Sequence, residues 1–417
     1  MHVTVRRYLP SMVLLFVAAG ALAGVLVLRA TDRREYLYRF KASARVESPL
    51  KAIAFFESRL EAGGRGPLDL AELSGLYLAQ GRISSDPAWF DRAERAAAES
   101  LTLLPTSNPA RLVQARIADA RHRFDEAVAL ASQSLAERPE PAALSQLAAS
   151  HLAAGRLALA LRFADEARRV RPTFEAYLLR ARVLAAEGRM AEAESDLRHA
   201  VVVEDLGSPG ESAQLRAFWG EMLTRDGRHA KAARLLDESL RILPGNAQAL
   251  GLKGELELRQ GRYEAAEALF LEAFQASRQA RDLVRYARAR AAGHGQPAAV
   301  QLREQAEKIL RRELERDLGH RLDLVHLLLD RARPEDLQEA VRLTAAEILV
   351  RQGPEAILLR CRALVATGEL EGALRELKTA LAKERLGPEL LGLKADIEAS
   401  LGNPDRVARG QAIPDRG

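Results

Sequence analysis

Apolar residues along most of this chain recur at helical spacing, and small residues return at a longer interval. Six alanines mark that interval, at Ala93, Ala127, Ala160, Ala193, Ala232 and Ala266. A glycine precedes four of them by five positions, at Gly155, Gly188, Gly227 and Gly261. Small residues let antiparallel helices approach, and glycine permits the turn between them. A repeat interval of about 34 residues is typical of stacked helix pairs, so the pattern predicts an all-α solenoid of antiparallel helix pairs.

A second internal comparison supports repeated units. Residues 175–184 and 355–364 share seven of ten residues at a separation of 180. Between Phe274 and Pro354 the pattern weakens, but residues 280–291, 298–317, 321–331 and 335–351 still read as helices. Two insertions, Ile83 to Trp89 and Leu206 to Gly210, interrupt the interval, and we expect them to lengthen surface turns.

The detailed spacing resembles the tetratricopeptide repeat family over roughly residues 67–405. The positions that carry the resemblance are Leu144, Leu147, Ala148, Gly155, Leu157, Ala160, Ala164, Ala167 and Pro172. The resemblance implies a right-handed superhelical solenoid whose first helices line a concave groove. It also implies a non-enzymatic scaffold that holds an extended peptide or a helix of another protein in that groove.

The expected layout has seven parts. They are an N-terminal tail (1–7), a transmembrane helix (8–28), a stem and leading helix (29–66), six repeats (67–278), two degenerate helical repeats (279–353), a last repeat with a capping helix (354–402) and a disordered tail (403–417). Tyr36, Tyr38 and Phe40 are interleaved among basic residues in the stem, a composition that suits the membrane interface.

The N-terminal span is predicted from an uncharged run, Tyr8 to Leu28, which as a helix reaches about 31 Å. A cleaved signal peptide is the alternative, because small residues near Ala21 resemble cleavage sites. Gly20 and Gly24 have the GxxxG spacing of transmembrane helix packing and make a homodimer possible, although glycine is common in such helices.

The side of the membrane is less certain than the span. Two arginines precede the span and six basic residues follow it within residues 29–45, which slightly favours a cytoplasmic solenoid. A long downstream domain can, however, be translocated largely regardless of its charge. The predicted localisation is therefore a single-pass protein of the inner membrane, with the side of the solenoid open.

Composition argues against most chemistry. Of 417 residues, 62 are basic and 57 acidic, a net charge of +5 spread along helices, which does not indicate nucleic-acid binding. The single cysteine, Cys361, excludes disulfide and CxxC chemistry and is expected in the core. His320 and His326 would lie on different helix faces, and nucleotide-binding and hydrolase motifs are absent. We therefore predict no catalytic residues, no metal and no cofactor.

The partner-binding groove can be located from the repeat register. Groove-facing positions on the first helices are predicted at Leu112, Arg116, Leu178, Arg182, Glu221, Glu255, Leu358 and Arg362. A leucine paired with an arginine suits a partner segment that mixes apolar and acidic side chains. The alternative is that these arginines pair with glutamates of adjacent repeats.

The leading functional hypothesis is a bacterial-type, membrane-anchored scaffold of envelope assembly, secretion or complex maturation. The alternative is a glycan- or peptidoglycan-associated binding protein, which would need aromatic platforms that Trp89 and Trp219 do not readily supply. The partner, the pathway, the oligomeric state and the choice between groove and convex face stay open.

Overall fold

The computed structural model describes residues 35–40, 49–63, 66–84, 86–205, 209–315, 321–382 and 388–401. Within these ranges the chain forms helices and no strand. The helices are α2 (Leu50–Gly63), α3 (Pro67–Ser84), α4 (Pro87–Leu103), α5 (Ala110–Ala120), α6 (Phe124–Glu137), α7 (Pro141–Ala153), α8 (Leu157–Val170), α9 (Phe174–Ala186), α10 (Met190–Val202), α11 (Pro209–Arg225), α12 (His229–Ile242), α13 (Ala247–Arg259), α14 (Tyr263–Ser277), α15 (Ala280–His294), η2 (Gln296–Ala299), α16 (Val300–Glu315), α17 (Arg321–Arg331), α18 (Pro334–Val350), α19 (Pro354–Ala366), α20 (Leu370–Ala382) and α21 (Pro388–Leu401).

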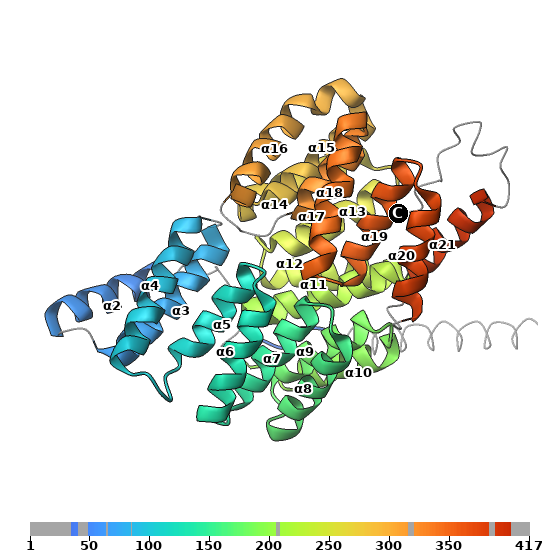
Figure 1. Ribbon diagram of the computed structural model, residues 1–417. Coiled ribbons are helices and arrows are strands. Elements are labelled where there is room, and N and C mark those ends of the chain that lie inside the picture. Colours follow the sequence, from blue (N-terminus) through green and yellow to red (C-terminus); the bar gives the residue numbers. More distant parts are fainter. Residues whose placement is uncertain are drawn as a thin grey trace, which may run out of the picture.

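These helices pack as consecutive pairs, from α3 with α4 to α19 with α20, and the pairs stack in chain order (Figure 1). The repeated alanines explain the close packing: Ala160, Ala193 and Ala232 are completely buried, because each lies where a second helix meets its partner. The predicted all-α solenoid is confirmed for the described residues.

Tight turns join the two helices of a pair, and at two of these turns the arginine after the glycine pairs with a residue of the preceding helix pair. Gly155 and Gly227 adopt φ values of +76° and +75°, which side chains with a Cβ adopt only with strain. Arg156 then pairs with Asp125 of α6, and Arg228 pairs with Glu194 of α10. The turns therefore align neighbouring pairs as well as reversing the chain.

The array bends back on itself. The turn between α7 and α8 lies against the connection between α18 and α19, where the backbone N–H of Gln352 donates to the carbonyl of Ala154 over 3.4 Å. A Cβ on Gly155 would approach the backbone of Gln352 to 2.7 Å. This turn contact brings together residues that are 198 positions apart.

The first insertion behaves differently from the expectation. Helix α3 continues to Ser84 and α4 begins at Pro87, so the insertion from Ile83 to Trp89 mainly extends these two helices and does not lengthen their turn. The second insertion lies between α10 and α11; its residues 206–208 are outside the described ranges.

No helix of the described residues is long and apolar enough to cross a membrane. The predicted tail (1–7), the predicted span (8–28) with Gly20 and Gly24, and the predicted disordered tail (403–417) all lie outside the described residues.

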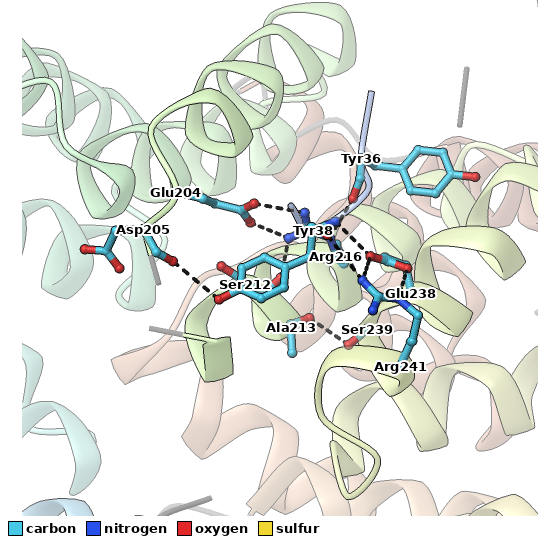
Figure 2. A network of polar contacts seen from close by, with 10 residues as sticks. All are labelled: Tyr36, Tyr38, Glu204, Asp205, Ser212, Ala213, Arg216, Glu238, Ser239 and Arg241. Carbon is cyan, nitrogen blue, oxygen red and sulfur yellow. Dashed lines mark hydrogen bonds and ion pairs between the residues drawn. The ribbon is translucent and has the colours of Figure 1, made fainter. Parts of the chain in front are cut away.

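Residues 35–40 of the predicted stem dock into the middle of the solenoid. Tyr36 is 2% exposed and Tyr38 is 6% exposed, and both pack against α11 and its neighbouring helices (Figure 2). The prediction that these aromatic side chains lie at the membrane interface is therefore wrong. The rings are buried within the protein, where Tyr36 packs in the cluster around Trp219 and Tyr38 packs against Ala213 and Ile242.

Candidate functional site

Three arginines mark the first helices of the early pairs. Arg82 lies on α3, Arg116 on α5 and Arg182 on α9. Arg82 and Arg116 are exposed and Arg182 is half-buried, yet the surrounding protein lowers the pKa of all three guanidinium groups by desolvation. Nearby protein thus displaces part of the hydration water of these three cations. We call the surface that carries these three arginines the inner face.

The inner-face arginines lack carboxylate partners. Among the residues that the structure describes, none of the three forms an ion pair. The charge of Arg116 lowers the pKa of Arg82 further, and Arg182 lies over the ring of Phe218, 5.5 Å from its centroid. Among the arginines predicted from the sequence, Arg116 and Arg182 therefore form no ion pair with glutamates of adjacent repeats within the described residues.

The two predicted glutamates are paired instead. The Glu221 carboxylate lies 2.7 Å from Arg225 and accepts a hydrogen bond from Gln248. Glu255 on α13 contacts Arg285, at 3.6 Å, and Arg288, both on α15 of a later pair. The charges of Glu221 and Glu255 are therefore balanced by arginines on α11 and α15, and the charge of Glu221 also partly offsets the desolvation of Arg182 on α9.

The predicted leucines contribute mainly to packing. Leu112 and Leu178 are each 8% exposed, and they belong to core clusters between successive pairs. Leu358 and Arg362 on α19 are half-buried, and Leu358 packs against the cluster around Cys361, which is completely buried as expected. The groups that α5 and α9 offer to a partner are therefore the arginines more than the leucines.

The sequence interpretation missed two residues of the inner face. Arg82 follows Gly75 by seven positions, so it shares the face of a position that the repeat register assigns to the groove. Asp119 follows Arg116 by three positions and accepts hydrogen bonds from Gln146, at 2.5 Å, and Ser150, at 2.8 Å. Helical spacing from the predicted positions could have identified both.

Asp119 is the only carboxylate of the described residues that influences Arg82 electrostatically. Burial raises the pKa of Asp119 to about 6, although the hydrogen bonds from Ser150 and Gln146 oppose the shift. Its Oδ1 is buried and has no hydrogen-bond partner within the described part of the chain. A partner group that donates a hydrogen bond to this oxygen would relieve that cost.

The tryptophans do not form open platforms. Trp219 is completely buried, and the guanidinium of Arg92 lies over the half-buried ring of Trp89, 4.8 Å from its centroid. Neither ring offers a free face on which a sugar could stack.

Two family models described as tetratricopeptide repeats match the chain, one over residues 145–209 and the other over residues 223–292. No curated protein matches the sequence. Both matched segments lie among the helix pairs from α7 to α15.

Three of the solved structures that resemble this chain are the following. The crystal structure of the APC/C hetero-tetramer Cut9–Hcn1 has a TM-score of 0.50 and 14% identity, over 78% of this chain and 60% of that chain. The tetratricopeptide protein TTC0263 of Thermus thermophilus has a TM-score of 0.39 and 25% identity, over 43% of this chain and 96% of that chain. Yeast Tom70 has a TM-score of 0.40 and 13% identity, over 93% of this chain and 97% of that chain. This chain thus spans about 60% of the length of the Cut9–Hcn1 chain, and that likeness concerns the fold alone.

Proposed function

We propose that this tetratricopeptide repeat protein is a non-enzymatic scaffold that binds an acidic segment of another protein on its inner face. The observation that carries the proposal is the set of unpaired arginines on α3, α5 and α9. Desolvating a cation without a counter-charge has a free-energy cost, and a carboxylate from a partner offsets it. Arginines also bind carboxylates in a bidentate, orientation-specific way.

The spacing of the arginines favours an elongated partner. Arg116 and Arg182 belong to the second and fourth helix pairs, and Ala149 of α7 occupies the corresponding position of the pair between them. A short side chain there leaves room for a peptide backbone, with acidic side chains directed to either side. An extended peptide or a helix with separated acidic residues therefore fits the inner face best.

The cellular setting belongs to the same proposal. We propose that residues 8–28 anchor the scaffold in the inner membrane by a single pass, where it serves envelope assembly, secretion or complex maturation. The uncharged run from Tyr8 to Leu28 supports this anchor. Reporter fusions at both termini would test the anchor and assign the side of the membrane; an extractable, unanchored protein would contradict it.

A crosslinked pull-down of the full-length protein tests the inner face. We expect Arg116→Glu combined with Arg182→Glu to lose specific partners, because carboxylates would repel an acidic segment. The matched control is Arg169→Glu combined with Arg312→Glu, which changes net charge equally at exposed arginines on the second helices α8 and α16. Partners that both double variants retain, or that both lose, would contradict the inner-face proposal.

A further inference from the structure

We infer that the junction between α10, α11 and α12 is a peptide-recognition site, and that residues 35–40 of this chain are its resident ligand. We call this junction the docking site; its polar residues are Glu204, Asp205, Arg216, Glu238 and Arg241 (Figure 2). It is separate from the inner face and independent of the function proposed there.

The docked segment has the side-chain alternation of an extended strand. Tyr36 and Tyr38 are buried, whereas Leu37 is 39% exposed and Arg39 is exposed. Alternate side chains of an extended chain point to opposite sides, so one set enters the protein and the other faces solvent. The site therefore recognises the two tyrosines of a Tyr-X-Tyr pattern, whereas the side chain of the intervening residue faces solvent.

Side chains of the docking site bind the backbone of the segment. The Arg216 Nε donates to the carbonyl of Tyr36 over 2.6 Å, and the Tyr38 N–H donates to the Glu238 carboxylate over 2.8 Å. Arg241 donates to the carbonyl of Tyr38 over 3.4 Å. Backbone hydrogen bonds combined with pockets for alternate side chains are the usual basis of extended-peptide recognition.

Each tyrosine has its own surroundings. Tyr36 belongs to the core cluster that contains Leu215 and Trp219, and Tyr38 packs with Ala213 and Ile242. The hydroxyl of Tyr38 donates to the carbonyl of Asp205 over 3.4 Å, and the Arg216 guanidinium lies 5.7 Å from the ring centroid. These contacts distinguish tyrosine from a smaller apolar residue.

A charged residue fixes the start of the segment. The carboxylate of Glu35 pairs with Arg198 of α10 and lies 3.3 Å from Lys231 of α12. Burial raises the pKa of this carboxyl, but the hydrogen bond from Arg198 and the charge of Lys231 outweigh burial and lower it overall. This ion pair at the start of the segment therefore sets the direction of the peptide as well as its position.

The described part of the connection between α10 and α11 contributes to the site. The interval between the repeated alanines is longer here, from Ala193 to Ala232, than in the neighbouring pairs. Glu204 lies in the lengthened connection, and its carboxylate pairs with Arg216; the two side chains are 1% and 0% exposed. Arg216 also donates to the carbonyl of Ser212 over 2.8 Å, so its guanidinium is held in place for the peptide.

The covalent link favours occupancy by the chain's own segment. Ordering the segment opposes binding, while burial of two tyrosines and the backbone hydrogen bonds favour it. A short linker gives the segment an effective concentration on the order of millimolar. A free peptide at micromolar concentration should therefore enter the site only after the link is cut.

The test uses the full chain in detergent with a protease site introduced between Lys41 and Ser48. After cleavage, we expect a fluorescent peptide of residues 33–42 to bind, with fluorescence anisotropy as the measurement. The uncut protein should bind the peptide at least tenfold more weakly, because the resident segment occupies the site.

Matched peptides test the recognition pattern. Tyr36→Ala or Tyr38→Ala in the peptide should weaken binding at least tenfold, whereas Leu37→Ser should change it less than threefold. The Arg116→Glu and Arg182→Glu protein should bind the peptide like the wild type, so failure of the inner-face proposal would leave this result unaffected.

Three outcomes would overturn the inference. The first is that the cut protein binds no peptide, and the second is that cut and uncut proteins bind it equally. The third is that cleavage followed by removal of the N-terminal fragment unfolds the helices, as measured by circular dichroism; the segment would then be a part of the fold and not a ligand.

Discussion

The inner face and the docking site use arginine in opposite ways. Arg116 is accessible, surrounded by protein and without an ion pair within the described residues. Arg216 is completely buried and is bonded to Glu204, to the carbonyl of Ser212 and to the carbonyl of Tyr36. The docking site is complete when residues 35–40 occupy it, whereas the inner face still lacks a counter-charge.

Because of this difference, we expect substitutions in the docking site to affect mainly stability and substitutions on the inner face to affect mainly binding. Removal of one member of a buried ion pair leaves the other desolvated, so the docking site should be sensitive to substitution. Removal of an unpaired cation relieves a cost, so the inner face should tolerate substitution while losing its ligand. The following experiments measure the two regions on the same scale, the free energy of unfolding.

The largest effect is expected for Arg216→Ala. It leaves the carboxylate of Glu204 buried without its partner, which should lower the free energy of unfolding by about 3 to 5 kcal/mol. The control is Arg225→Ala on the same helix, whose pair with Glu221 has side chains 61% and 25% exposed and should contribute at most about 1 kcal/mol. Urea denaturation followed by circular dichroism provides both values; equal losses would contradict the contrast.

Gly155→Ala should disturb the turn contact between Ala154 and Gln352. Positive φ alone costs about 1 to 2 kcal/mol, and the new Cβ would also meet the Gln352 backbone at 2.7 Å, so we expect a loss of about 2 to 4 kcal/mol. Gly227→Ala has a similar φ and no atom within 4 Å, so thermal unfolding of the two variants isolates the turn contact. Identical midpoints would show that the contact contributes nothing.

Asp119→Asn should stabilise the protein at neutral pH. Because the pKa of Asp119 is raised to about 6, the folded state binds this proton more tightly than the unfolded chain does. The contribution of Asp119 to the free energy of unfolding is fully present below about pH 4. It is lost as the pH rises to about 6, because the buried carboxyl must then ionise. The variant should exceed the wild type by up to about 3 kcal/mol at pH 7 and match it at pH 4. Urea denaturation at both pH values checks the sign, and a variant less stable at pH 7 would refute it.

The smallest effect on stability is expected for Arg116→Ala. Because this arginine has no ion pair to lose, the free energy of unfolding should change by less than about 0.5 kcal/mol. Partner capture in the crosslinked pull-down should nevertheless decrease. A large loss of stability would assign Arg116 a structural role instead.

The residues of the two sites differ in how far the sequence predicts them. Arg116 and Arg182 follow from the repeat register, because every repeat directs the same positions of its first helix to the same face. Burial of Leu112 and Leu178 does not follow, since the depth of a side chain depends on how closely the next pair packs. Asp119 and Arg82 could have been found by extending the same helical spacing.

The docking site shows most directly what the sequence does not predict. The sequence reveals both of its parts, the aromatic residues Tyr36 and Tyr38 and the longer interval between Ala193 and Ala232. It does not reveal that they meet, because no periodicity relates residues about 180 positions apart in an irregular segment and an insertion. The aromatic residues therefore suggested a membrane interface.

The sequence by itself determined the helices and their pairing, because these depend on local spacing repeated in every unit. Only the tertiary structure decided which distant parts of the chain contact one another. The turn contact at Gly155 and the docking of residues 35–40 both join distant parts of the chain. Such contacts arise from the accumulated curvature of many pairs and from the shape of one enlarged junction, which no single repeat encodes.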